Sequence, residues 1–78
     1  MNILITGGAG YIGSELVRYL INDHHVTVID NMMYDHTTLL RYTQNEKFNF
    51  VKGDVRDLSL LEQLVSSHDV IIPLAALV

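Results

Sequence analysis

Residues 6–13 read Thr6-Gly7-Gly8-Ala9-Gly10-Tyr11-Ile12-Gly13 and decide the fold of this 78-residue chain. The stretch follows the apolar run Ile3–Ile5 and opens a helical pattern. Its glycines match two spacings, G-x-G-x-x-G from Gly8 and G-x-x-G-x-x-G from Gly7. A turn between a strand and a helix presents unpaired backbone N–H groups at the positive end of the helix dipole, and glycines let an anion approach them closely. The stretch therefore predicts a phosphate-binding turn, although a glycine pattern alone also fits a tight turn that binds nothing.

A second marker, Asp30, closes the apolar run Val26–Ile29. An acidic residue about 20 residues after the glycine turn is the place where dinucleotide-binding units bind the adenosine ribose through its 2′- and 3′-hydroxyls. Asp30 alone would also fit an ordinary acidic strand end, but the combination favours a dinucleotide. A carboxylate repels a 2′-phosphate and residues 31–33 contain no arginine, so NAD is favoured over NADP; Arg41 would have to fold back to change this.

Composition excludes several other classes of protein. The net charge is −4, 49% of the residues are hydrophobic, and there is no cysteine. These values indicate one small globular domain without a nucleic-acid surface, a disulfide framework or a thiolate metal site. No basic segment precedes an apolar stretch at the N-terminus, and the apolar run at 70–78 is too short to span a bilayer. We therefore expect a cytoplasmic protein with no membrane partner.

Alternating strands and helices are expected along the chain. The strands are predicted at 2–6, 25–30, 47–52 and 69–74, and the helices at 11–22, at 39–42 after a cap at 37–38, and at 57–67. The first strand is continuously apolar, as central parallel strands are, whereas 47–52 alternates as strands near a sheet edge do. Leu58, Leu61, Leu64 and Val65 are predicted as the apolar stripe of the last helix. Right-handed crossovers then give a Rossmann-like α/β fold, a parallel sheet in the order 3-2-1-4 with helices on both faces.

With these features the chain resembles the extended short-chain dehydrogenase/reductase family, and more narrowly its NAD-dependent nucleotide-sugar epimerases and dehydratases. The resemblance covers all 78 residues but only the N-terminal part of that family's NAD(P)-binding Rossmann domain. Thr6–Gly13 matches the T-G-x-x-G-x-x-G turn, and Asp30-Asn31 the acidic position after the second strand. Gly53-Asp54-Val55 matches a G-D-[IV] segment, and Leu74-Ala75-Ala76 the L-A-A after the fourth strand.

This resemblance implies a set of cofactor-binding residues. They are Gly7, Gly10, Tyr11, Ile12, Gly13, Asp30, Asn31, Asp54, Val55, Leu74, Ala75 and Ala76. In the family the aspartate at position 54 and the backbone after it approach the adenine; apart from the resemblance, Asp54 would be a turn residue. Residues 75–76 fit cofactor contact and plain packing about equally. Many members have a histidine where Pro73 stands, and because proline cannot donate to a sheet, the fourth strand is expected to end or bend there.

The catalytic residues of the family are missing from this chain. Its members use a tyrosine with a lysine four residues later as general base, and none of the four tyrosines here is followed by a lysine at that spacing. We also find no metal-ligand spacing among the histidines. The chain alone is therefore expected to be inactive and to supply only the adenosine and pyrophosphate half of the cofactor site.

Two interpretations of the whole chain stay open. The first is the NAD-binding N-terminal piece of an epimerase or dehydratase. The second is a free-standing nucleotide-binding or assembly module. In both, the apolar run of the fourth strand leaves an unpaired sheet edge. We expect this edge to self-associate or to pair with a missing C-terminal part.

Overall fold

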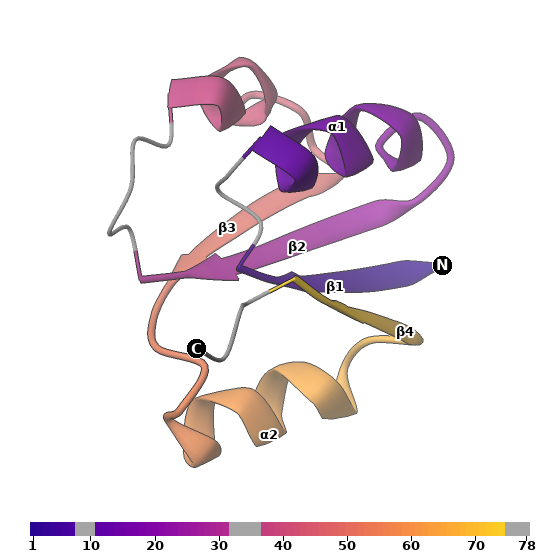
Figure 1. The fold of residues 1–78 in the computed structure, drawn as a ribbon. Helices are drawn as coiled ribbons and strands as arrows, with labels where there is room; N and C mark the ends of the chain where they lie inside the picture. Colours follow the sequence, from indigo (N-terminus) through magenta and orange to yellow (C-terminus); the bar gives the residue numbers. More distant parts are fainter. Residues whose placement is uncertain (8–10, 32–36, 75–78) are drawn as a thin grey trace.

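A computed structural model of the chain describes residues 1–7, 11–31 and 37–74 (Figure 1). Strands and helices alternate along the sequence, as expected. The elements are β1 Asn2–Thr6, α1 Tyr11–Leu20, β2 His25–Asp30, the 3₁₀ helix η1 Thr37–Tyr42, β3 Phe48–Lys52, α2 Leu58–Ser66 and β4 Val70–Pro73.

The strands form one parallel sheet in the order β3-β2-β1-β4, which confirms the predicted Rossmann-like topology. The central strand β1 is buried from Ile3 to Thr6, in keeping with its continuous apolar sequence. β4 ends at Pro73, the position where the missing N–H was expected to end the strand. Leu74 N–H donates to the carbonyl of Thr6, so alternation along β4 turns the Pro73 nitrogen toward the open edge of the sheet.

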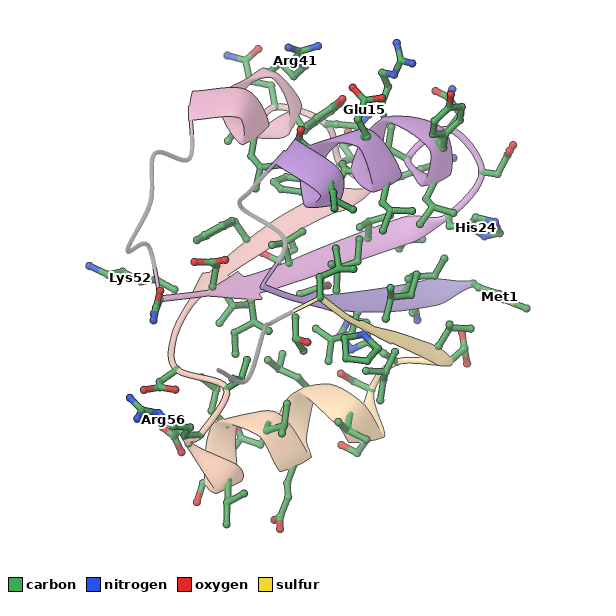
Figure 2. The ribbon with its side chains drawn as sticks, viewed as in Figure 1. Met1, Glu15, His24, Arg41, Lys52 and Arg56 are labelled. Carbon is green, nitrogen blue, oxygen red and sulfur yellow. The ribbon has the colours of Figure 1, made fainter. Side chains whose placement is uncertain are left out.

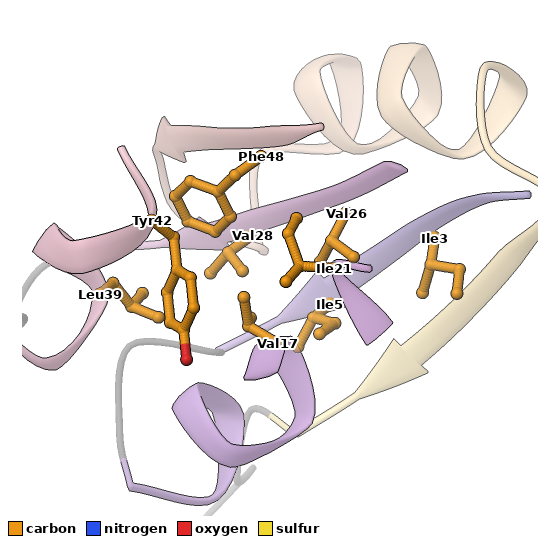
Figure 3. Close-up of a cluster of buried hydrophobic side chains, with 9 residues drawn as sticks. All are labelled: Ile3, Ile5, Val17, Ile21, Val26, Val28, Leu39, Tyr42 and Phe48. Carbon is orange, nitrogen blue, oxygen red and sulfur yellow. The ribbon is translucent and has the colours of Figure 1, made fainter. Parts of the chain in front are cut away.

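The hydrophobic core lies between the sheet and the layer formed by α1 and η1 (Figure 3). Val17 and Ile21 meet Val26 and Val28 of β2, and Tyr42 packs on Phe48 with ring centroids 5.9 Å apart. Gly13 is buried on this side of α1, whereas Ile12 is 67% exposed and does not belong to the apolar face. The buried side of α1 therefore starts at a glycine.

The opposite face of the sheet is covered by α2 alone among the described elements (Figure 1). No residue of α2 is fully buried. The predicted apolar stripe was wrong in part, because Leu58 is 71% exposed and Val65 is also exposed, while Leu60 turns toward the sheet. Leu60, Leu61 and Leu64 are half-buried, and they form the inner side of the helix instead.

Candidate functional site

The carboxyl ends of all four strands meet at one edge of the sheet. Three backbone hydrogen bonds, each just beyond a strand, join them there. Leu74 N–H donates to the Thr6 carbonyl at 2.8 Å, Gly7 N–H to the Ile29 carbonyl at 2.8 Å, and Gly53 N–H to the Asp30 carbonyl at 3.0 Å. In open parallel sheets this edge is where ligands bind. The bonds bring four of the predicted cofactor-binding segments to one place.

The glycine turn leaves β1 at Gly7, whose φ of 75° lies in the left-handed region. A side chain at this position would strain the backbone, so glycine is required by the conformation itself. Gly10, the central residue of the motif, lies outside the described residues.

The two α-helices differ in what their first turns offer to an anion. The first turn of α1 contains no acidic residue, so no carboxylate opposes an anion at its positive end. At α2, by contrast, Asp57 is the N-cap residue, and its carboxylate accepts a hydrogen bond from Leu60 N–H at 3.2 Å. The start of α1 is therefore the better place for a phosphate of the ligand.

Asp30 ends β2 and is half-buried, and Asn31 after it is exposed. The register pairs Asp30 with Lys52, the last residue of β3. Register partners in adjacent strands lie about 4.8 Å apart, so the backbones of Asp30 and Lys52 are neighbours at this edge. We did not foresee Lys52 from the sequence. The signal was available, because both residues close strands that the predicted order makes neighbours.

Arg41, the residue that would have to fold back to receive a 2′-phosphate, does not lie beside Asp30. It is exposed on η1, with its guanidinium 5.8 Å from the centroid of the Tyr42 ring. Figure 2 shows it on the outer side of the α1–η1 layer, whereas Lys52 lies at the end of the sheet and Arg56 lies beside the start of α2.

Asp54 begins the turn between β3 and α2, one residue after the bond from Gly53 to Asp30. Its carboxylate accepts from the backbone N–H of Arg56 at 2.9 Å and from the Nη2 of the same residue at 2.7 Å. These hydrogen bonds from Arg56 lower the pKa of Asp54 from 3.8 to about 2. The side chain is thus held as a carboxylate, which can only accept hydrogen bonds.

The other predicted site residues have mixed positions. Val55 and Leu74 are half-buried at the same edge, and Ile12 is exposed one residue after the start of α1. Ala75 and Ala76 lie outside the described residues, as does the side chain of Tyr11.

The described part of the chain contains neither a metal-binding cluster nor a membrane-spanning helix. No cluster of three or more histidine, cysteine, aspartate or glutamate residues there has the geometry to hold a metal ion. No helix in the same ranges is long and apolar enough to cross a bilayer.

The residues at this edge fit a dinucleotide. A glycine with a positive φ leads to a helix start without a carboxylate, as a pyrophosphate requires. Asp30 offers acceptors for hydroxyls and Asp54 offers an acceptor for an amino group. These groups bind and orient a ligand. Nothing among them supplies a general base for hydride transfer.

Comparison with known proteins agrees with this geometry. A protein from Haloferax volcanii, described as low-salt glycan biosynthesis protein Agl12, is 42% identical over an alignment of 80 positions, gaps included; the alignment covers 97% of this chain and 26% of that protein. The crystal structure of dTDP-glucose 4,6-dehydratase from Bacillus anthracis in complex with NAD superposes with a TM-score of 0.87 at 33% identity, over 99% of this chain and 27% of that one.

An epimerase matches as well as the dehydratase does. UDP-glucuronic acid 4-epimerase from Bacillus cereus in complex with NAD gives a TM-score of 0.87 at 32% identity, covering all of this chain and 27% of that one. The chain thus spans about a quarter of the length of these proteins. The profile of the NAD dependent epimerase/dehydratase family matches residues 3–78. On its sequence and its fold, this chain belongs to the NAD dependent epimerase/dehydratase family.

Proposed function

We propose that residues 1–78 are the N-terminal part of an NAD-binding Rossmann domain and bind the adenosine and pyrophosphate half of the cofactor. The observation that carries this proposal is the set of backbone hydrogen bonds that gathers the strand ends around Gly7 and Asp30. The absence of a carboxylate from the first turn of α1 supports it. So does the presence of NAD in the similar dehydratase and epimerase structures.

Each segment has a separate role in this proposal. The turn at 7–13, with Tyr11 and Ile12 at the helix start, receives the pyrophosphate on its backbone N–H groups. Asp30 accepts from the ribose hydroxyls, with Asn31 beside it. Asp54 accepts from the adenine amino group next to Val55, and residues 74–76 line the cofactor where β4 ends.

The reaction belongs, in this proposal, to a longer protein that acts on a nucleotide-sugar as an epimerase or dehydratase. There NAD supplies a hydride acceptor for a sugar carbon. The chain of 78 residues contains no tyrosine followed four residues later by lysine. We therefore expect no epimerisation or dehydration by this chain alone, and turnover by the purified chain would contradict the assignment.

The direct test is thermal unfolding of the purified chain with NAD and, separately, with NADP. A ligand at 100 times its dissociation constant adds about 2.7 kcal/mol to the free energy of unfolding. We expect this increase with NAD and a smaller one with NADP, because the Asp30 carboxylate repels a 2′-phosphate. The variant Gly10→Val should lose the response to NAD, since its side chain blocks the approach of the pyrophosphate.

Three outcomes would change the assignment. Equal responses to the two dinucleotides would remove the role of Asp30, and Lys52→Gln would then test whether the neighbouring ammonium receives the 2′-phosphate. A cooperative transition that neither ligand shifts would contradict cofactor binding. The absence of a cooperative transition would mean that the chain needs further polypeptide to fold.

The second candidate function is an assembly module. It is favoured by the exposed apolar residues Val70 and Ile71 on β4, the edge strand beside β1. An uncovered apolar edge is a template for pairing with another chain. A stable chain that associates through β4 but does not respond to either dinucleotide would support this candidate over the first.

A further inference from the structure

Asp54 and Arg56 form the most closely bonded pair of charged side chains among the described residues. Arg56 Nη2 donates to Asp54 Oδ2 at 2.7 Å, and Nε lies 3.1 Å from both carboxylate oxygens. The backbone N–H of Arg56 adds a bond to Oδ1 at 2.9 Å. A planar guanidinium that meets a carboxylate through two N–H groups fixes both its position and its orientation.

The turn that carries this pair is itself fixed. Asp57 N–H donates to the Asp54 carbonyl at 2.9 Å and closes the turn, and the Asp57 side chain caps α2. On the other side, Gly53 is bonded to the end of β2. The Asp54 carboxylate is thus held relative to Asp30, while the Arg56 side chain is 82% exposed and packs on little else.

The pair leaves limited room for one more hydrogen bond. A carboxylate has about four acceptor positions, and three N–H groups of Arg56 already occupy part of this capacity. An incoming group must therefore donate. The amino group of adenine donates, whereas the 6-oxo oxygen of hypoxanthine only accepts.

We propose that Arg56 is the positioning residue of the base-binding carboxylate: its bonds to Asp54 fix an acceptor that selects a 6-aminopurine dinucleotide over a 6-oxopurine one. This inference rests on the proposed NAD site and assigns a base-selecting role to a residue outside the family markers quoted above. Arg56 acts through Asp54 and is not itself a contact of the base.

The protonation state of Asp54 gives a readout that is independent of any ligand. The pKa of Asp54 is lowered to about 2 by Arg56. A carboxyl group with a lowered pKa is ionised at every pH above its ordinary pKa. It takes up a proton only when the pH falls toward the lowered pKa. Without the guanidinium, the pKa of Asp54 should rise toward its ordinary value of 3.8, although the backbone N–H of residue 56 still lowers it.

The experiment compares four variants of the full chain with the unaltered protein. Titration calorimetry at neutral pH measures dissociation constants for NAD and for nicotinamide hypoxanthine dinucleotide. The variants are Arg56→Gln, Arg56→Lys, Asp54→Asn and, as control, Arg18→Gln. Arg18 is also an exposed arginine in an ion pair with a nearby carboxylate, Glu15 at 3.4 Å, but it lies on α1.

We expect the unaltered protein to prefer NAD by roughly tenfold or more, the value of a hydrogen bond to a charged group. Arg56→Gln should lower this ratio several-fold, Arg56→Lys should keep part of it, and Asp54→Asn should abolish it, because an amide also donates to a 6-oxo group. Arg18→Gln should leave the ratio unchanged. In Arg56→Gln the Asp54 carboxyl carbon, followed by NMR, should titrate at a higher pH than in the unaltered protein, where the pKa is about 2.

The outcomes separate this inference from the proposed function. If the unaltered chain unfolds cooperatively and yet binds neither dinucleotide, the NAD site and the inference fail together. If it binds NAD without preference, or if Arg56→Gln keeps the ratio or weakens both ligands equally, the inference is wrong and the NAD site stands.

Discussion

Gly53 joins β3 to the turn that carries Asp54. The space around its Cα explains why a glycine stands at this position. A Cβ at this position would lie 2.5 Å from Leu60 Cδ2 and 3.6 Å from Ile29 Cδ1. The obstacle is the end of a flexible side chain, and φ at Gly53 is not positive. The glycine is therefore required by the close approach of α2 and not by backbone strain.

We expect Gly53→Ala to lower the free energy of unfolding by about 1 kcal/mol, the low end for an overpacked core, because Leu60 has to move. Urea denaturation measures the change. In a Leu60→Ala background the same substitution should cost much less, since the obstructing methyl group is gone. Leu64→Ala, on the next turn of α2, is the matched control and should be additive with Gly53→Ala. Additive costs for Leu60 as well would contradict the proposed contact.

At the scale of elements, α2 is held to the sheet by a polar contact at its end. His68 Nε2 lies 2.8 Å from the hydroxyl of Thr27, a buried polar residue of β2. His68 Nδ1 contacts the Leu64 carbonyl, which only accepts. In the neutral ring Nδ1 therefore carries the proton, and Nε2 accepts from the Thr27 hydroxyl. The histidine thus closes the helix and satisfies a hydroxyl inside the sheet.

Replacing His68 by leucine should cost about 1–3 kcal/mol of unfolding free energy, because the Thr27 hydroxyl is left buried without its partner. Thr27→Val in the same background should recover much of that loss. A double-mutant cycle by urea denaturation gives the coupling between the two side chains. His25→Leu, at an exposed histidine that starts β2, should have little effect. Coupling near zero between residues 27 and 68 would refute the contact.

The sequence was sufficient to predict the strands that are buried on both faces of the sheet, because such strands are apolar along most of their length. The apolar runs at Ile3–Ile5 and Val26–Ile29 predicted strands correctly, and the continuous first run also predicted a central strand, because both strands are buried on both faces. The periodicity of α2 misled us at Leu58. Helical periodicity shows that one side of a helix is apolar, but it does not show which apolar residues are buried against another element. Leu58 is the first residue of α2, and it is 71% exposed.

Parts of the candidate site could not be predicted from the sequence, because they depend on how separate segments pack together. The glycine turn and Asp30 were recognisable because they stand at fixed distances along the chain. The predicted strand ends already put Asp30 and Lys52 on neighbouring strands, but their pairing residue by residue depends on the register of β2 against β3, which is a tertiary property. The bonds from Arg56 to Asp54 depend on the turn conformation, which a spacing of two residues does not determine.

The molecule as a whole is unequally covered on its two faces (Figure 1). The face under α1 and η1 holds the buried cluster around Val17, Val26 and Val28. On the other face no residue of α2 is fully buried. Val65, Val70 and Ile71 are exposed, the latter two on an edge strand. Exposed apolar residues along an unpaired edge favour association.

We therefore expect the isolated chain to self-associate through the β4 edge with a second copy of itself. Val70 and Ile71 supply apolar surface, while the Pro73 nitrogen that faces the open edge offers no N–H, so the pairing should stop before that residue. Sedimentation velocity should show a weight-average mass that rises with concentration in the unaltered chain. Ile71→Lys should suppress this rise, because charged side chains protect sheet edges.

The matched control for this association is Tyr19→Lys. Tyr19 is 70% exposed but lies on α1, which covers the face of the sheet opposite to the face under α2. The control should associate as the unaltered chain does, since it adds the same charge away from β4. A mass that stays monomeric from micromolar to millimolar concentration would refute the edge as a self-association surface. Equal suppression by Ile71→Lys and Tyr19→Lys would also count against the β4 edge, because a lysine on α1 should leave the pairing of β4 intact.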